Sequence, residues 1–210
     1  MTAKSSTNNW DKVASDSAIA KAVEALSLNG IEAMVVANGK EAHEKVLELV
    51  PEGAEVMTMT SVTLDSIGIP EVLDGSGKYD SVKKKLMSTN RETEALQMQR
   101  LGAAPEYAVG SVHAVTEDGK VVVVSNTGSQ LPAYAYGSMH VIWVVGGQKI
   151  VKDLDAAMER VYEHVLPLES ERARIAYGVE GSNVSKLLTV TREVNPNRIK
   201  MIIVKEPLGF

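Results

Sequence analysis

The chain has 210 residues, a length that fits one domain with a sizeable hydrophobic core. Hydrophobic residues make up 44% of it and charged residues 23%, which argues against a disordered chain. The 22 lysines and arginines against 27 aspartates and glutamates give a net charge of −5, which disfavours a nucleic-acid binder. Because the chain has no cysteine, disulfides, thiolate zinc sites, cysteine nucleophiles and iron–sulfur clusters held by four cysteines are excluded.

The sequence lacks the patterns of a signal peptide and of a membrane span. Its first ten residues, MTAKSSTNNW, are polar, and its most apolar stretch is 141–145. That stretch is far shorter than the roughly 20 residues that cross a bilayer. We therefore expect a cytoplasmic protein that binds neither membranes nor nucleic acids.

Helices and strands alternate through the first third of the chain. Ile19, Val23 and Leu26 share one helical face, and Asn29-Gly30 is a common helix stop. The predicted elements are a helix over 11–29, a strand over 31–36, a helix that ends before Pro51, a strand over 55–60 and a helical segment over 61–73. This order predicts parallel strands covered by helices.

The segment over 80–101 is polar and is predicted to be helical. Its apolar stripe, formed by Val82, Leu86 and Leu96, is narrow. A narrow stripe is typical of a solvated surface helix, and a lid or a homodimer contact is the alternative.

Strand patterns dominate the middle of the chain. Residues 108–116 alternate apolar with small or polar side chains, Asp118-Gly119 predicts a tight turn, and 121–125 read VVVVS. This pattern indicates a β-hairpin, and the run of valines indicates a strand buried on both faces. The remaining predictions are a buried strand over 139–145, an amphipathic helix from Asp153 up to Pro167 and a strand over 199–204.

Together these elements predict an α/β fold: a single domain with a mainly parallel sheet covered by helices, plus an embedded β-hairpin. Residues 1–17 are expected to form an N-terminal extension with the start of the first helix, and 18–210 the α/β domain. The sequence shows no internal repeat and no flexible linker between domains.

Familiar cofactor and nucleophile motifs are missing from the sequence. No Gly-x-Gly-x-x-Gly follows a predicted strand, and no Gly-x-Ser-x-Gly nucleophile elbow occurs. His43-Glu44 opens a zinc-protease pattern, but Leu47 stands where the second histidine would be. We therefore predict no metal site, and the sequence identifies no cofactor.

The strongest candidate for a binding site is a polar loop directly after the valine-rich strand. In α/β sheets, ligands gather beyond the carboxyl ends of the strands, and Gly128 lets the backbone approach a ligand closely. Hydroxyl and amide side chains suit phosphate or carboxylate recognition, whereas the alternative is a polar turn that satisfies its own backbone. The loop residues are Ser125, Asn126, Thr127, Gly128, Ser129 and Gln130.

A second polar cluster, Thr60, Ser61 and Thr63, follows the strand over 55–60. If the strands are parallel, it lies at a carboxyl edge and can face the first loop across a cleft. The alternative is that Ser61 or Thr63 caps the helix that follows.

Histidines and lysines supply the remaining candidates. His113 in the hairpin is the candidate general base, and His140 is a weaker one, although a lone histidine at a strand end is more often structural. Lys149 and Lys152 flank a predicted helix start, where they either attract an anion or belong to a solvated face.

Two long phrases of the sequence resemble a LUD domain, the lactate-utilisation family. NGIEAMVVANGKEAHEKVLELVPEGAEVMTMTSVTLDSIGI is similar to the first half, with the pattern Ser-x-Thr-x-x-x-Ile-Gly at 61–68. AVGSVHAVTEDGKVVVVSNTGSQLPAYAYGSMHVIWVVGGQKIVKDLDAAM resembles the second half: a hairpin, a polar loop, a strand, then Lys-Ile-Val and a helix. The likeness covers about 18–165.

The resemblance implies a fold similar to the sugar-phosphate isomerase and coenzyme A transferase group. It also implies a place in the oxidation of lactate to pyruvate, beside iron–sulfur partner proteins. Since this chain has no cysteine, it is expected to be a non-redox component that binds a small carboxylate- or phosphate-bearing ligand. The alternatives are a stand-alone isomerase or transferase acting on a phosphorylated or coenzyme A-linked substrate, and a regulatory ligand-binding module.

Overall fold

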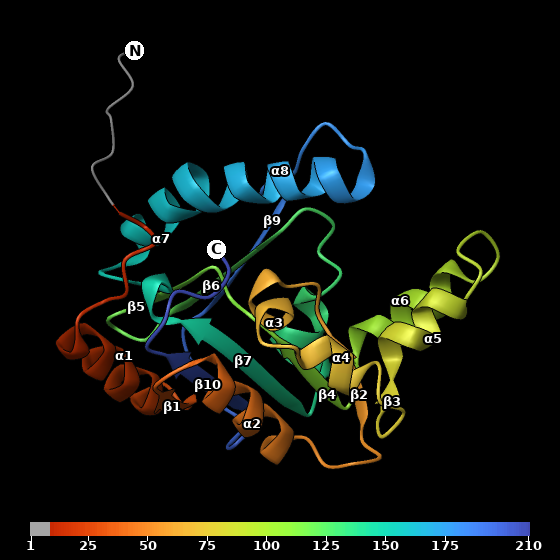
Figure 1. Cartoon of the computed structure of the whole chain (residues 1–210), viewed down its shortest axis with the longest axis horizontal. Helices are drawn as coiled ribbons and strands as arrows, with labels where there is room; N and C mark the ends of the chain where they lie inside the picture. Colours follow the sequence, from red (N-terminus) through yellow and green to blue (C-terminus); the bar gives the residue numbers. More distant parts are fainter. Residues whose placement is uncertain (1–8) are drawn as a thin grey trace.

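Residues 9–210 are described by the computed structural model of the chain (Figure 1), in which the strands form two sheets. The strands are β1 (Glu32–Val36), β2 (Glu55–Thr58), β3 (Asp80–Ser81), β4 (Tyr107–Gly110), β5 (Ala114–Thr116), β6 (Val121–Ser125), β7 (His140–Gly146), β8 (Ile150–Val151), β9 (Lys186–Val190) and β10 (Ile199–Val204). Six form a parallel sheet in the order β1-β10-β7-β4-β2-β3. The other four form a mixed sheet in the order β8-β5-β6-β9.

Helices cover the outer faces of these sheets. The α-helices are α1 (Asp16–Leu28), α2 (Gly39–Leu49), α3 (Val62–Ser66), α4 (Ile69–Leu73), α5 (Val82–Ser88), α6 (Ala95–Ala103), α7 (Leu154–Arg160) and α8 (Leu166–Tyr177). Shorter turns are π-helical at η1 (Ala133–Gly137) and η3 (Val161–Val165) and 3₁₀-helical at η2 (Gly147–Lys149). The predicted α/β fold with a mainly parallel, helix-covered sheet is confirmed.

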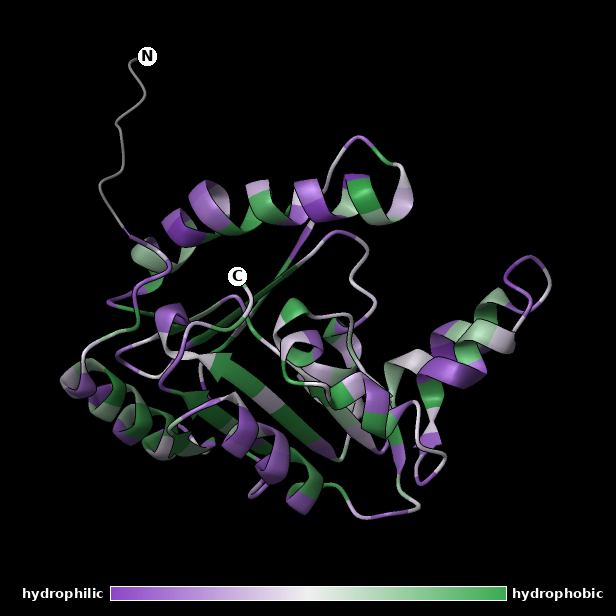
Figure 2. Cartoon of the chain, in the orientation of Figure 1, coloured by the Kyte–Doolittle hydropathy of each residue, from purple (hydrophilic) through white to green (hydrophobic). Residues whose placement is uncertain are grey.

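Strand β7 shows how the layers are built. Its side chains alternate between two faces, as the pleat of a strand requires. This alternation places Trp143 and Val145 in one hydrophobic core with α1 and the second sheet. Ile142 and Val144 lie in another core with α2, α3 and α4. Figure 2 shows the resulting apolar sheet between amphipathic helices.

Strand β6 repeats this arrangement in the second sheet. Val121 and Val123 face the core shared with the parallel sheet, while Val122 and Val124 pack with α7 and η3. The predicted hairpin is confirmed, because β5 and β6 pair antiparallel across Asp118-Gly119. All four valines are buried, as the sequence predicted. The layers therefore run helices, parallel sheet, second sheet with α1, then the helices α7 and α8.

Three predicted elements divide in the structure, and the first is the helical segment over 61–73, which becomes α3 and α4. The strand expected over 108–116 becomes β4 in the parallel sheet and β5 in the second sheet, because the chain leaves one sheet for the other between Gly110 and Ala114. The helix expected over 80–101 becomes β3, α5 and α6, and α5 ends where Thr89 Oγ1 donates to the carbonyl of Lys85. The α5–α6 pair projects from the body of the molecule (Figure 1).

The helix that begins at the predicted cap Asp153 continues past Pro167 to Tyr177. Proline lacks an N–H, and here it falls in the first turn of α8, just after the π-helical turn η3. The missing N–H thus falls next to a turn where the hydrogen-bond pattern has already changed from α to π. Within residues 9–210, no helix combines the length and apolarity needed to cross a membrane.

Two buried glycines test the packing around β4. A Cβ atom at Gly110 would lie 1.7 Å from Tyr134 Oη, whereas one at Gly102 would meet only ordinary contacts at 3.8 Å and beyond. We expect Gly110→Ala to lower the free energy of unfolding by about 1–3 kcal/mol or more through overpacking. Gly102→Ala, inside α6, should be neutral or stabilising by about 0.5–1 kcal/mol. Urea unfolding of both variants checks this, and equal stabilities would contradict it.

Candidate functional site

The carboxyl ends of four neighbouring strands carry the candidate site. Thr63 follows β2, Ser111 follows β4, Lys149 follows β7 and Leu208 follows β10. These strands are adjacent in the order β10-β7-β4-β2, so the segments after them meet at one edge of the parallel sheet. This edge is where α/β proteins commonly bind ligands.

Lys149 is the centre of this site. Its Nζ donates to Thr63 Oγ1 at 2.9 Å and to Ser111 Oγ at 3.1 Å, and its side chain is only 1% exposed. Within residues 9–210, no carboxylate forms an ion pair with it. Burial, with a smaller contribution from the charge of Arg160, lowers the pKa of Lys149 to about 7. The amine is therefore shared between its charged and neutral forms near neutral pH.

Arg160 is a second buried cation beside the same segment. It is 0% exposed, and its Nη1 donates to the carbonyl of His113 at 3.1 Å. Its Nε and Nη2 atoms are buried and have no hydrogen-bond partner among residues 9–210. Burial lowers the pKa of Arg160 to about 10, against the smaller opposing effect of Asp11, so the guanidinium stays charged at neutral pH.

Arg198, another buried arginine, shows what a structural guanidinium looks like in this fold. Its Nη1 is 2.6 Å from a carboxylate oxygen of Glu193, and its other donors reach backbone carbonyls of η1 and its flank. Arg198 is therefore paired and hydrogen-bonded, as buried charges generally are. Arg160 differs because it has one backbone acceptor and no carboxylate partner within the described chain.

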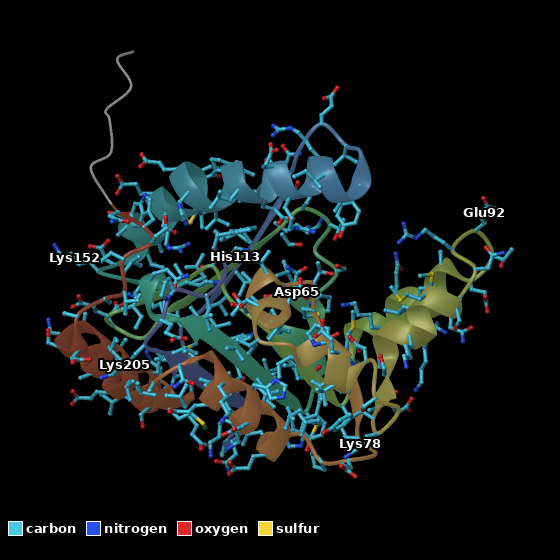
Figure 3. The ribbon with its side chains drawn as sticks, in the orientation of Figure 1. Asp65, Lys78, Glu92, His113, Lys152 and Lys205 are labelled. Atoms are coloured by element: carbon cyan, nitrogen blue, oxygen red, sulfur yellow. The ribbon has the colours of Figure 1, made fainter. Side chains whose placement is uncertain are left out.

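His113 is half-buried (Figure 3) and lies near enough to Lys149 and Arg160 for both charges to affect its pKa. Its Nδ1 accepts a hydrogen bond from the amide of Val124 at 3.1 Å, so the ring proton lies on Nε2. Burial, and then the charges of Lys149 and Arg160, lower the pKa of His113 to about 3. Its role as a general base stays a prediction, and the structure gives the neutral ring a contact that joins it to β6.

The polar loop after β6 forms a network of its own. Ser125 Oγ donates to Gln130 Oε1 at 2.9 Å and accepts from the amide of Gly128 at 2.8 Å. Thr127 Oγ1 donates to Ser129 Oγ at 3.2 Å, and Asn126 Oδ1 accepts from Ser185 Oγ at 3.2 Å. Gly128 has a φ of +85°.

The structure gives this loop no hydrogen bond to Lys149 or Thr63 within residues 9–210. Ligand binding there stays a prediction.

The members of the second predicted cluster, Thr60, Ser61 and Thr63, have different roles in the structure. Ser61 caps α3 by accepting from the amide of Leu64, and Thr60 is exposed. Thr63 is 1% exposed and reaches Lys149, so it is the predicted residue that the structure brings into the buried site. His140 stacks on Tyr107 at 4.5 Å between ring centroids, at the opposite end of β7 from the site.

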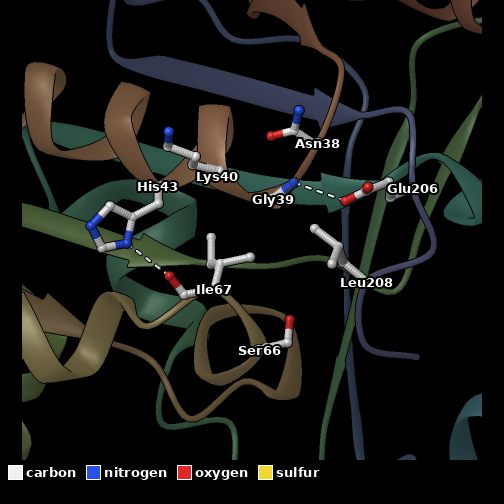
Figure 4. Close-up of a pocket in the computed structure, with 8 residues that line it drawn as sticks. All are labelled: Asn38, Gly39, Lys40, His43, Ser66, Ile67, Glu206 and Leu208. Carbon is white, nitrogen blue, oxygen red and sulfur yellow. Dashed lines mark hydrogen bonds between the residues drawn. The ribbon is translucent and has the colours of Figure 1, made fainter.

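The segment after β10 contacts Thr63 and Gln148, beside Lys149. Thr63 Oγ1 donates to the carbonyl of Leu208 at 3.1 Å, and Gln148 Nε2 donates to the carbonyls of Leu208 and Gly209 at 3.1 and 3.0 Å. Leu208 also borders a surface pocket of about 580 Å³ (Figure 4). That pocket is lined by Asn38, Gly39, Lys40, His43, Ser66, Ile67, Glu206 and Leu208.

The pocket and the buried site are neighbours separated by this segment. In the pocket, the amide of Gly39 at the start of α2 donates to Glu206 at 2.9 Å, and His43 Nδ1 lies 2.7 Å from the carbonyl of Ile67 (Figure 4). A carboxylate of the chain therefore already occupies the helix N-terminus that would attract an anion. Leu208 borders this pocket, and its backbone carbonyl also accepts a hydrogen bond from the hydroxyl of Thr63.

Sequence reasoning did not select Ser111, Arg160 or Gln148 as site residues. Arg160 could have been noticed, since it lies three residues after Ala157 and next to Val161 on the apolar face of its helix. Lys149 was a candidate for attracting an anion because it lies near a predicted helix start. Its position in the apolar run VVGGQKIV is a stronger indication that it is buried. Within residues 9–210, no group of three or more histidine, aspartate or glutamate side chains is placed to hold a metal ion.

Fold and site together define an α/β protein with a buried cationic centre at the carboxyl edge of a parallel sheet. The family model of the LUD domain matches residues 19–204, and the chain belongs to the LUD domain family. The predicted resemblance is thereby confirmed, and the family is associated with lactate utilisation.

The fold is also similar to a solved structure, the crystal structure of a DUF162 family protein from Deinococcus radiodurans, DUF162 being the LUD domain. The two share 10% identity with a TM-score of 0.57, over 92% of this chain and 99% of the other. At that identity the likeness establishes the fold alone. Comparison with curated proteins gives no match.

The lowered pKa of Lys149 predicts how the free energy of unfolding changes with pH. Lys149 has an ordinary pKa of 10.5 when unfolded and about 7 when folded, so between these values the unfolded chain binds more protons. Stability therefore rises with pH across this interval, by at most about 1.4 kcal/mol per pH unit for one proton. Lys149→Met abolishes this contribution. Urea unfolding should show the stability of the wild type gaining on that of Lys149→Met from about pH 7 towards pH 10.

Lys152→Met is the matched control, because Lys152 is exposed. Its difference from the wild type should stay constant over the same pH range. A constant difference for Lys149→Met as well would show that the amine of Lys149 is as readily protonated in the folded protein as in water.

Proposed function

We propose that this chain is a non-redox component of lactate utilisation that binds a small carboxylate- or phosphate-bearing ligand at Arg160 and Lys149. Family membership supports the pathway, and the absence of cysteine supports the non-redox role. Iron–sulfur proteins of the same pathway are the partners included in the proposal.

The observation that carries the ligand class is the unpaired guanidinium of Arg160. A buried charge without a partner is costly, and proteins generally pair it or use it. Two donors of Arg160 lack acceptors within residues 9–210, and a carboxylate or phosphate supplies two oxygens in the matching geometry. Lys149 adds a second positive charge when it is protonated, and an anion beside it favours that form.

The hydroxyls around Lys149 suit the same ligands. Ser111 Oγ and Thr63 Oγ1 are both within 3.1 Å of Nζ, and hydroxyl groups can donate to an anion or accept from a ligand hydroxyl. The surroundings are otherwise apolar, since β7 and β4 are buried strands. A site of this kind favours a small, compact anion.

A second candidate function, transfer of an acyl group from a coenzyme A-linked or similar substrate, is favoured by one contact. Ser111 Oγ and Lys149 Nζ lie 3.1 Å apart, which is the distance of a nucleophile from its base. Anion binding uses the charged form of Lys149, whereas acyl transfer uses its neutral form. The two functions can therefore be tested separately.

Thermal shift measurements with pyruvate, lactate and inorganic phosphate test the anion-binding proposal. A ligand at 100 times its dissociation constant adds about 2.7 kcal/mol of stability, which raises the Tm of a chain of this size by about 5–10 °C. We expect Arg160→Met to abolish the shift. Without ligand, the variant should be as stable as the wild type or more stable, because an uncompensated buried charge has been removed.

Two variants complete this test. Arg174→Met removes an exposed arginine of α8 and should keep the full shift. Thr127→Ala with Ser129→Ala tests the loop after β6, where each lost hydrogen bond should cost about 0.5–1.5 kcal/mol of binding. If the loop variant loses the shift and Arg160→Met keeps it, the ligand binds at the loop and the buried site is the wrong assignment.

A further inference from the structure

We propose that Ser111 is a nucleophile that Lys149 activates as its general base, and that its substrates are carboxylic esters or thioesters. The proposal rests on the second candidate function, acyl transfer, and is independent of the binding of an anion at Arg160. It rests on the arrangement of two hydroxyls around a buried amine, and on the difference in exposure between them.

The hydrogen bonds around Lys149 have a defined direction. Thr63 Oγ1 donates its only proton to the carbonyl of Leu208 at 3.1 Å, so towards Lys149 it can act only as an acceptor. Lys149 therefore donates one N–H to Thr63, at 2.9 Å. A neutral amine held in this way has its lone pair free for Ser111 Oγ at 3.1 Å. The competing acceptor for the Ser111 hydroxyl, the carbonyl of Val112, is further away at 3.5 Å.

This arrangement has the three parts of an activated nucleophile. Ser111 is the nucleophile, Lys149 is the base within hydrogen-bond distance, and Thr63 orients the base. Thr63 is a positioning residue, since it acts through Lys149. Its backbone is fixed in α3, and the carbonyl of Leu208 fixes its hydroxyl.

Ser111 is more exposed than Lys149 and Thr63, as a nucleophile with a shielded base should be. Lys149 and Thr63 are each 1% exposed, whereas Ser111 is only partly buried. Ser111 is therefore the most exposed of the three residues, while the base stays shielded from water. Burial also holds the pKa of Lys149 at about 7, where a large fraction of the amine is neutral.

Other lysines of the chain show why the missing carboxylate matters. Lys85 Nζ lies 2.5 Å from Asp80 and 3.5 Å from Glu55, and these carboxylates raise its pKa. An amine paired in this way remains protonated and has no lone pair to accept a proton. Lys149 contacts hydroxyl oxygens instead, so nothing in direct contact with it stabilises the charged form to that extent.

The proposed step balances without any other reactant. Ser111 Oγ attacks the carbonyl carbon of the ester or thioester, and its proton passes to Lys149 Nζ. The bond from that carbon to the leaving oxygen or sulfur then breaks, and the protonated amine returns its proton to the leaving group. The products are an acyl ester on Ser111 and a free alcohol or thiol.

Acetylation by p-nitrophenyl acetate tests this step with an uncharged probe. Intact-mass spectrometry of the wild type should show one acetyl group, peptide mapping should place it on Ser111, and p-nitrophenol should be released in a burst. The burst rate should rise with pH and reach half its maximum near pH 7, where Lys149 loses its proton. Ser111→Ala should abolish the burst, and Ser27→Ala, at an exposed serine of α1, should leave it unchanged.

Variants of Lys149 show whether its ability to accept a proton, and not only its positive charge, is needed. Lys149→Met and Lys149→Arg should each slow the burst by about 10²–10⁴-fold, because neither side chain can accept the proton. Thr63→Val should keep a measurable burst whose pH midpoint is displaced from that of the wild type. Circular dichroism and Tm of each variant show that it is folded.

Two results would overturn the proposal. The first is acetylation of the amine of Lys149 or of other residues at the same rate in Ser111→Ala. The second is a folded Lys149→Arg with the burst rate of the wild type. Loss of anion binding in Arg160→Met bears only on the proposed function, because the acetyl probe carries no charge.

Discussion

Strand β7 lies at the centre of the domain, and both of its faces must be apolar. Trp143 and Val145 pack towards α1 and the second sheet, while Ile142 and Val144 pack towards α2, α3 and α4. At the carboxyl end of β7 the neighbouring segments are close-packed, unlike those at the end of β6. The chain turns there through Gly146-Gly147, against the segment that follows β10.

The two glycines explain why Lys149 is buried. A Cβ atom at Gly146 would lie 2.6 Å from the amide nitrogen of Leu208, and one at Gly147 would lie 2.8 Å from a methyl group of Val13. Only a residue without a side chain lets these segments approach so closely. The next residue, Gln148, donates to the carbonyls of Leu208 and Gly209, and both Gln148 and Lys149 are buried. The packing of β7 thus determines the environment of the amine.

Much of the fold could be predicted from the sequence, because the signals are local. The valine run of β6, the Asp118-Gly119 turn and the cap at Asp153 each depend on neighbouring residues, and each is confirmed. Alternation by itself could not show that 108–116 is shared between two sheets. That division depends on which strand each half pairs with: β4 pairs with β2 and β7, and β5 with β6 and β8.

The site was harder to predict because it also depends on which strands are neighbours. Thr63 was selected because it follows a strand of a predicted parallel sheet, and such ends converge on one edge. Its contact with Lys149 joins residues 86 positions apart, and that of Lys149 with Ser111 joins residues 38 apart. Strand order decides these contacts, and a single sequence does not reveal that order. Arg160 resembles an ordinary charged helix residue until its helix is packed on β5 and β6.

The two proposals concern the same amine in different protonation states, and this links them physically. Lys149 donates to Ser111 and Arg160 donates to the carbonyl of His113, so both contact the same segment, and the charge of Arg160 helps to lower the pKa of Lys149. An anion bound at Arg160 offsets that charge and favours the protonated amine. Lys149 then serves as a cation and ceases to be a base. With the guanidinium uncompensated, a larger fraction of the amine is neutral and can accept the proton of Ser111. The two proposals taken together therefore assign to Arg160 the choice between Lys149 as a cation and Lys149 as a base.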